Sequence, residues 1–229
     1  NTFEDNTRHL RDYDAETNLQ ELVANNTFDT AAYAEGGQQF LYSSIDDAVN
    51  GDRLADGGAS AGDTIIVTSG TGTYEESIEV SKPDLTIRGE GSPVIDGRID
   101  IPVDGTTIED LTVRDGDPSG SDEVEAIFVG NANGFDDTSE NIVIRDVTIE
   151  DVHPHGINGK AVEGIHAKHY DAGENIDGLV ISNVTIRNIT QPTWGADGIK
   201  LQAGIRDVSI NNSTTIEDIE GSWAYGVVA

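Results

Sequence analysis

Ile144-Arg145-Asp146-Val147-Thr148-Ile149-Glu150-Asp151 is the stretch that decides the fold, because its pattern recurs along the chain. The pattern is Ile-x-Asp/Asn-Leu/Val-Thr/Ser-Ile/Val-x-Asp/Asn, and we align it with residues 108–115, 181–188 and 205–212. Each copy holds two short β-branched segments separated by Asp or Asn, residues that tolerate left-handed backbone angles in tight corners. The repeat therefore predicts two short strands joined by a corner in each copy.

A second aligned series supplies a third strand in each repeat. It runs over residues 125–128, 163–166, 197–200 and 225–228. No amphipathic helical period separates the strands after residue 60, as a Rossmann-like sheet would need, and the parallel repeat leaves no place for the hairpins of a β-sandwich. We predict an all-β fold, a right-handed single-stranded parallel β-helix (solenoid).

The two ends of the chain differ from the repeat. Residues 44–49 predict a short helix that covers the first coil, with Ser44 as N-cap and Asp47 at the capping-box position. We divide the chain into an N-terminal appendage, residues 1–40, and the β-helix, residues 41–229. The appendage is expected to be partly helical, over residues 14–25, and to act as a docking segment or linker. Because the sequence stops inside a predicted strand, we expect an open last coil and a longer or oligomeric biological object.

The order of motifs between residues 43 and 97 resembles the opening coils of the pectin-lyase-like β-helix superfamily. The motifs are the helix at 43–49, Gly-Asp-Thr-Ile-Ile-Val at 62–67, Gly-Thr-Tyr-Glu-Glu at 72–76, Leu-Thr-Ile-Arg-Gly at 85–89 and Val-Ile-Asp-Gly at 94–97. The resemblance covers residues 43–229 and implies the right-handed parallel β-helix scaffold. The superfamily includes polysaccharide lyases, epimerases, viral tailspikes and surface proteins, so no single activity is implied.

The charge balance indicates the environment and excludes several partners. The chain has 43 Asp and Glu against 13 Lys and Arg, a formal net charge of -30. In molar salt the Debye length falls to about 3 Å, which removes most of the resulting repulsion. We therefore predict a protein of an extreme halophile or of its virus. A field of this sign repels nucleic acid, and no apolar run approaches the ~20 residues that span a bilayer, so we expect neither nucleic-acid binding nor a membrane span.

Acceptor triplets for N-glycosylation point to an exported protein. Their asparagines are Asn25, Asn183, Asn188, Asn211 and Asn212. Together with the halophilic charge, they favour an extracellular location, at a cell surface or in a virion. The absence of cysteine excludes a disulfide framework.

One outward face of the predicted β-helix collects cationic and acidic side chains. If Ile165 and Ile199 point into the core, the residues that follow them point outward on successive coils, about 4.8 Å apart. The predicted catalytic group on this face is His166, Lys168, Lys200 and Asp197. Two of the four lysines of an acidic chain fall in this patch, which indicates a function rather than random decoration.

Further side chains near this face are candidate substrate-binding residues. Four of the five histidines lie within residues 153–169. Trp194 lies in a predicted loop, where it either stacks on a sugar ring or anchors the loop to the coil. The predicted substrate-binding residues are Trp194, Gln202, His153, His155, His169 and Tyr170.

A polyuronate substrate would give this face a chemical purpose. A cationic spot binds the sugar carboxylate, and a neutral Lys or His takes the proton from the adjacent carbon, as in β-elimination or epimerisation. Residues 151–156 resemble the Asp-Pro-His motif of mannuronan epimerases, with Val-His inserted after the Asp. Residues 195–198 resemble the Asn-Thr-Asp-Gly segment of polygalacturonases, but no second carboxylate motif follows. A lyase or epimerase is therefore favoured over a glycoside hydrolase.

The sequence identifies no cofactor and leaves the bound ion open. The histidine spacing matches no dedicated zinc motif. Oxygen-rich loops suit Ca²⁺, and Asp115, Asp117 and Asp122 form one such segment, so Ca²⁺ is a candidate ligand.

Two functions remain open on the sequence. The first is a spike-like or tail-fibre-like surface or virion β-helix that contacts a polysaccharide, cell-surface glycan or receptor and assembles with other subunits. The alternative is a polysaccharide-active enzyme, a uronate lyase or epimerase, that uses the face of His166, Lys168 and Lys200.

Overall fold

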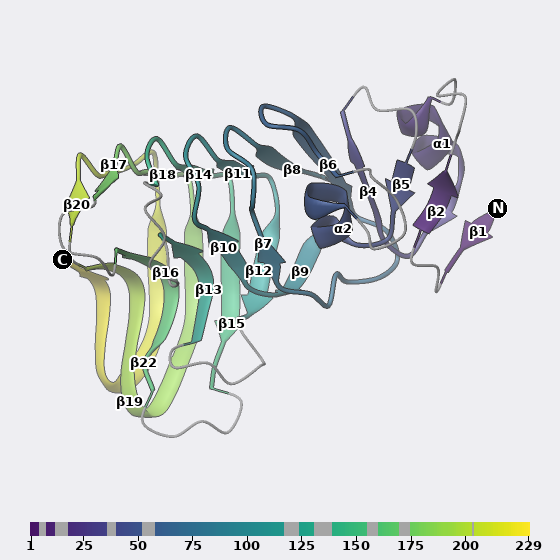
Figure 1. Cartoon of the computed structure of the whole chain (residues 1–229). Helices are drawn as coiled ribbons and strands as arrows, with labels where there is room; N and C mark the ends of the chain where they lie inside the picture. The colour runs from purple at the N-terminus through teal and green to yellow at the C-terminus, as the bar shows by residue number, and fades with distance from the viewer. Residues whose placement is uncertain are drawn as a thin grey trace.

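The structure, a computed structural model, describes residues 1–4, 8–11, 18–35, 40–51, 58–116, 124–130, 139–154, 160–169, 175–202 and 204–229. Short strands dominate it and are stacked from the N-terminal to the C-terminal end of the chain (Figure 1). Along most of the stack, each strand pairs with its equivalent in the next repeat and not with its neighbour in sequence. The described helices cannot cross a membrane, because none is long and apolar enough.

Three columns of parallel strands make up the stack, and one strand from each column forms a rung. The first column is β6 (Thr64–Thr68), β8 (Thr86–Glu90), β11 (Thr107–Glu109), β14 (Val143–Arg145), β18 (Val180–Ser182) and β21 (Ser209–Asn211). The second column is β9 (Val94–Gly97), β12 (Thr112–Asp115), β15 (Thr148–Val152) and the first parts of β19 (Thr185–Gln202) and β22 (Thr215–Val228). The third column is β7 (Ile78–Glu79), β10 (Ile99–Ile101), β13 (Val124–Val129), β16 (Val162–Lys168) and the second parts of β19 and β22. A short parallel pair, β17 (Ile176–Asp177) with β20 (Ile205–Arg206), lies beside the first column.

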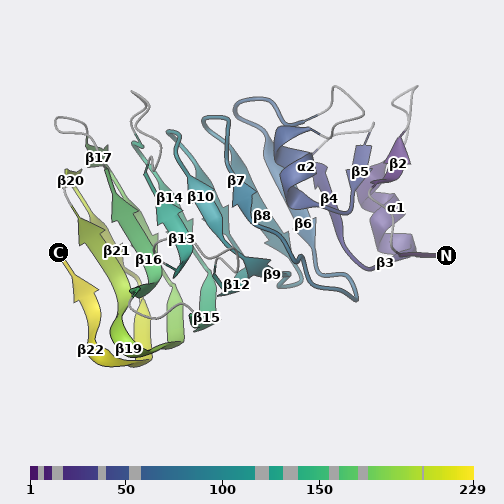
Figure 2. The same cartoon turned by 60° about the horizontal axis from the view of Figure 1, so that its bottom comes forward.

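This topology confirms the predicted all-β fold with parallel strands and fits a parallel β-helix. Figure 2 shows β7, β10, β13 and β16 following one another along the stack, as their pairing requires. In the first column, Ile87, Ile108, Ile144 and Ile181 stand in register on successive rungs and are fully buried. Each rung therefore adds the same apolar contact to the next, which is how a stacked repeat gains stability.

Left-handed corners separate the first column from the second, as the repeat predicts. The corner residues Asp110, Asp146, Asn183 and Asn212 have φ values of 59°, 55°, 52° and 50°. Asn and Asp accept this conformation at lower cost than other residues with a Cβ. The Asn183 amide also donates to the Asp146 carboxylate at 2.6 Å, so the corner side chains are linked from one rung to the next.

The fourth copy of the repeat is placed differently from our alignment. Ile210, and not Ile205, pairs with Ile181, so the copy begins at residue 210; Ile205 pairs instead with Ile176. The alignment of residues 205–212 is therefore wrong by five positions. The physical reason is that Asp207 occupies a different corner, with φ of 48°. That corner also needs a polar residue followed by an apolar one, so its sequence looks like a copy of the repeat.

The first coil is covered by the predicted helix, α2 (Ile45–Asn50). Its N-cap Ser44 accepts a hydrogen bond from the Asp47 amide at 3.1 Å, and Ile45, Ala48 and Val49 are buried. The predicted helix and its cap are thereby confirmed.

The segment assigned to the appendage adds strands to the first column. Its elements are β1 (Thr2–Phe3), β2 (Arg8–Arg11), α1 (Leu19–Asn25), β3 (Thr27–Phe28), β4 (Ala31–Ala34) and, just after it, β5 (Phe40–Tyr42). Strand β4 pairs antiparallel with both β5 and β6, so it continues the sheet beyond the first parallel strand. Helix α1 begins after its N-cap Asn18, and the earlier part of the predicted helix lies outside the described residues.

Tyr74 and Glu76 of the Gly-Thr-Tyr-Glu-Glu motif join this end of the molecule to the stack. The buried Tyr74 hydroxyl accepts from the Ala31 amide at 2.8 Å and lies 3.0 Å from the Thr68 carbonyl oxygen. Burial raises the pKa of this hydroxyl above its usual range. The motif therefore serves a structural purpose here.

Glu76 caps helix α2 from a distant part of the chain. Its carboxylate accepts from the Ser44 hydroxyl at 2.6 Å and from the Ile45 and Asp46 amides at 2.7 and 3.1 Å. Burial raises the pKa of Glu76, and these three hydrogen bonds oppose the shift. The first amides of a helix have no partner within the helix, and at a water-exposed end water can bind them. At the start of α2, Glu76 is their partner.

Arginines alternate with carboxylates along the outer face of the second column. The register-matched residues are Asp96, Arg114, Glu150, Arg187 and Glu217. Arg114 donates to Asp96 at 3.0 and 3.1 Å, and Arg187 donates to Glu150 at 2.9 Å. We call this set the alternating ladder. It offsets part of the repulsion in a chain with so many acids.

Candidate functional site

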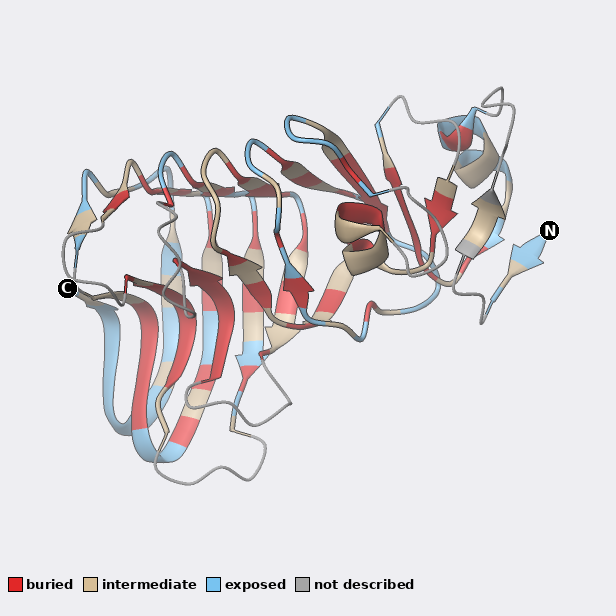
Figure 3. Ribbon diagram, viewed as in Figure 1, coloured by how far each residue is buried: buried red, intermediate tan, exposed pale blue. Residues whose placement is uncertain are grey.

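The candidate site lies on the third column, where the predicted register is confirmed. His166 pairs with Phe128 on one side and Lys200 on the other. The side chains are nevertheless buried: His166 has no exposed surface and Phe128 has 2 %. Strands β13 and β16 are buried along almost their whole length (Figure 3). The expected outward group is therefore a buried cluster and not an open surface patch.

Inward and outward side chains do not alternate strictly along β16, and this break adds acidic residues to the group. A Cβ at Gly164 would lie 2.8 Å from Cγ2 of the core residue Ile186, so position 164 points inward, and the next residue, Ile165, is also in the core. Two consecutive inward positions bring Glu163 and His166 to the same outer face. Ala126 and Gly198 are the equivalent small residues on the neighbouring rungs, so the same reasoning applies to each rung.

The resulting set, which we call the β16 cluster, combines acids and bases from three strands, β13, β16 and β19, with Arg98, which precedes β10. Its members are Arg98, Glu125, Glu163, His166, Lys200 and Gln202. Sequence reasoning found His166, Lys200 and Gln202 but missed Arg98 and the role of the two glutamates. The signal that could have found them is the acid that precedes each Ala/Gly-Ile pair at residues 125, 163 and 197.

His166 is held between two oxygen atoms. Its Nδ1 lies 3.1 Å from Oε1 of Glu125, and its Nε2 lies 3.0 Å from Oε1 of Gln202. The Phe128 ring packs edge-on at a centroid distance of 5.6 Å. The imidazole is therefore fixed in orientation, with an oxygen atom beside each nitrogen.

Two ion pairs complete the cluster. Lys200 donates to Glu163 at 2.6 Å, and Arg98 donates to Glu125 at 2.8 Å. Arg98 also pairs with Asp100 and lies 5.0 Å above the centre of the Phe128 ring. Burial raises the pKa of Asp100, and the Arg98 charge opposes this shift.

The remaining predicted residues of this face lie beside the cluster. Asp197 is buried and stands in register with Glu163, and Lys168 is half-buried and stands in register with Gln202. His169, which follows β16, is also buried. The structure thus brings all four predicted catalytic residues to one face, together with the predicted substrate-binding residue Gln202.

His153 belongs to another part of the molecule. Its Nδ1 lies 2.8 Å from the Asp151 carbonyl oxygen, and its Nε2 lies 3.5 Å from the Asp115 carboxylate. It therefore sits at the corner after the second column. His155 and Tyr170 lie outside the described residues, as do Asp117 and Asp122 of the proposed calcium segment.

Trp194 is exposed, as stacking on a sugar ring requires, and it has an aromatic neighbour. It is 44 % exposed, Trp223 is 47 % exposed, and the two rings meet edge to face at 5.0 Å. The Trp223 ring also lies against the backbone of Gly195, where a Cβ would collide with it. We call Trp194 and Trp223 the aromatic pair.

The chain matches no family model, no curated protein and no solved structure. The likeness to the pectin-lyase-like superfamily thus remains a prediction from the motifs, and the function has to be argued from the side chains.

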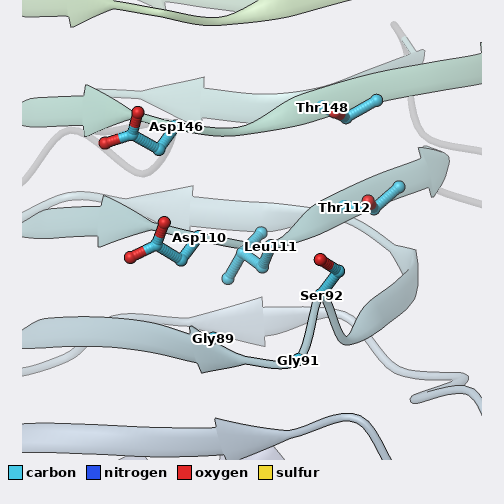
Figure 4. A pocket seen from close by; sticks show the side chains of 8 residues that line it. All are labelled: Gly89, Gly91, Ser92, Asp110, Leu111, Thr112, Asp146 and Thr148. Atoms are coloured by element: carbon cyan, nitrogen blue, oxygen red, sulfur yellow. The ribbon is translucent and has the colours of Figure 1, made fainter.

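A pocket of about 240 Å³ opens at the corner between the first two columns. It is lined by Gly89, Gly91, Ser92, Asp110, Leu111, Thr112, Asp146 and Thr148 (Figure 4). Partial burial and the Asp146 charge raise the pKa of Asp110. Both acids have positive φ, so the corner geometry alone accounts for their presence. We therefore assign the pocket no ligand.

The predicted glycosylation sites are at the surface, but four of their five amides donate hydrogen bonds. The exposed asparagines are Asn25, Asn183, Asn188, Asn211 and Asn212. Asn25 and Asn211 donate to Glu21 and Ser209 nearby, whereas Asn183 and Asn188 donate to Asp146 and Asp151 on the neighbouring rung. A glycan attaches through that nitrogen, so at Asn183 and Asn188 it would be added next to a link between rungs.

Proposed function

We propose that this protein is a right-handed parallel β-helix that serves as an extracellular surface or virion element of an extreme halophile and contacts a glycan. The right-handed form is supported by general stereochemistry, because connections between parallel strands of one sheet are right-handed in about 98 % of cases. The halophilic environment is supported by the net charge of -30 and by the alternating ladder, which matches arginines to acids on successive rungs.

The observation that carries the glycan contact is the exposed aromatic pair. Indole rings offer flat apolar faces that are costly to leave in water, and sugar rings present C–H groups that cover such faces. Trp194 and Trp223 come from adjacent rungs, and their edge-to-face contact fixes the angle between the rings. Trp223 lies within β22, and Trp194 lies at the register shift between Gln191 and Gly195 in β19.

Glycan binding by Trp194→Ala, by Trp223→Ala and by the double variant tests this proposal. We expect the wild type to bind members of a panel of neutral and uronic-acid oligosaccharides in molar KCl, and each single variant to bind at least about 10-fold more weakly. Ile210→Ala removes another exposed apolar residue and is expected to bind like the wild type. Equal binding by the wild type and a folded double variant would refute the glycan contact.

A second function, that of a uronate lyase or epimerase, is favoured by the β16 cluster. Lys200 is the candidate base, since its side chain is 11 % exposed whereas that of His166 is fully buried. In β-elimination the base takes the proton next to the sugar carboxylate, and the glycosidic C–O bond breaks with its electron pair leaving on oxygen. Formation of an unsaturated uronate by the wild type but not by Lys200→Met would favour this function. Lys200 is held in an ion pair with Glu163 that would have to break before the amine could act as a base, so the surface function is our first choice.

A further inference from the structure

The β16 cluster contains three metal-ligating side chains that converge in the interior of the protein. Glu125 comes from β13, and Glu163 and His166 come from β16 on the next rung. Their side chains are at most 4 % exposed, and one ligand atom from each lies within 4.8 Å of the other two. Arg98 and Lys200 each pair with one of these carboxylates and offset part of their mutual repulsion.

The distance between His166 and Glu125 suits two ligands of one ion. Zn²⁺ binds imidazole nitrogen and carboxylate oxygen at about 2.0–2.2 Å, which puts two tetrahedral ligand atoms roughly 3.3 Å apart. The observed distance between Nδ1 of His166 and Oε1 of Glu125 is 3.1 Å. The third ligand atom, on Glu163, lies within 4.8 Å of the other two.

The imidazole provides an independent indication of a cation at this position. A neutral ring carries one N–H, yet both nitrogens of His166 face oxygens. If Nε2 donates to Gln202, as the free ring N–H of a metal-bound histidine donates to its outer partner, the lone pair of Nδ1 faces the Glu125 oxygen. A cation between these two atoms turns that contact from repulsive to attractive.

The charges around the cluster leave room for a divalent ion. The acids on the outer face of the third column are Glu79, Asp100, Glu125, Glu163 and Asp197, and the bases are Arg98, Lys168 and Lys200. Three basic and five acidic side chains thus lie on this face beside His166. Arg98 donates to one oxygen of Glu125 and Lys200 to one oxygen of Glu163, and the other Glu125 oxygen faces His166.

We propose that Glu125, Glu163 and His166 bind a divalent transition-metal ion that joins two adjacent rungs. The imidazole nitrogen selects an ion such as Zn²⁺ over Ca²⁺ or Mg²⁺, which prefer oxygen ligands. The site is separate from the aromatic pair and does not depend on glycan contact.

Zn²⁺ titration of the metal-depleted chain tests the site. The titration is made by calorimetry in molar KCl with excess Mg²⁺, which occupies surface carboxylates. We expect one Zn²⁺ per chain, and His166→Gln and Glu163→Gln should bind at least about 100-fold more weakly. Glu150→Gln, which removes an acid of the alternating ladder, should bind like the wild type. No Zn²⁺ binding by the wild type, or equal binding by His166→Gln, would overturn the proposal.

Co²⁺ provides a second measurement that needs no variant. Bound by a histidine nitrogen and two carboxylates in four-coordinate geometry, Co²⁺ should give strong visible absorption that one equivalent of Zn²⁺ removes. Weak absorption typical of surface carboxylates would show that a proton, and not a metal ion, lies between His166 and Glu125.

Discussion

Two groups of buried and half-buried polar side chains, one at the N-terminal end of the stack and one further along it, differ in what they bind. Tyr74 and Glu76, near the N-terminal end, direct their oxygens at main-chain groups and at the cap of α2. In the β16 cluster, by contrast, ionisable side chains bind one another across rungs. The first group binds backbone donors that the fold leaves without a partner. The members of the second group need one another, because their own charges lie away from water.

This difference separates polar side chains that stabilise the fold from polar side chains that serve a function. A backbone donor in the interior must be satisfied in any protein of this fold, so Glu76 requires no further explanation. A buried Lys–Glu pair could be replaced by apolar residues with little loss of stability or even a gain. Its presence therefore indicates a role other than stability, and the following variants test that distinction.

Lys200→Met should have the largest effect, since it leaves the Glu163 carboxylate buried without its main cation. We expect the free energy of unfolding to fall by about 3 kcal/mol, measured by denaturant titration in molar KCl. The double variant Glu163→Gln/Lys200→Met should recover most of this loss. If the double variant is as unstable as the single one, the pair is structural after all and the comparison fails.

Glu76→Ala should cost about 2 kcal/mol, because three donors at the start of α2 lose their acceptor. The neighbouring exposed Glu75→Ala serves as the matched control and should change the free energy by less than about 0.5 kcal/mol. Equal costs for the two variants would mean that Glu76 is as dispensable as a surface acid.

Glu150→Ala and Arg187→Ala should show the smallest coupling. A double-mutant cycle on this exposed pair is expected to give a small coupling in dilute salt and a still smaller one in molar KCl, where screening is nearly complete. A coupling in molar salt as large as that between Lys200 and Glu163 would place the alternating ladder with the buried clusters and not with the surface.

The strands and corners could be predicted because each repeat encodes them locally. Alternating β-branched residues and a corner Asp or Asn identify the rungs at Asp110, Asp146 and Asn183 without any knowledge of distant contacts. The same local rule caused the error in the fourth copy, since Asp207 and Asn212 both satisfy it. Only pairing with the preceding rung distinguishes the two positions.

The candidate site could be predicted only in part. The repeat gave the register of His166 with Lys200. It did not give the burial of His166 or the participation of Glu125, because strict alternation would have turned that acid away from the histidine. The consecutive inward positions at Gly164 and Ile165 reverse that expectation, and the need for a small residue at 164 is apparent only from its contact with Ile186.

The alternating ladder sets a rule for how this protein can lengthen or shorten. Its signs alternate along Asp96, Arg114, Glu150, Arg187 and Glu217, so the charge pattern repeats every second rung although the backbone repeats at every rung. Duplicating one rung would bring two like charges into register, while duplicating two adjacent rungs would preserve every pair. Tandem growth of such a protein should therefore proceed in even steps.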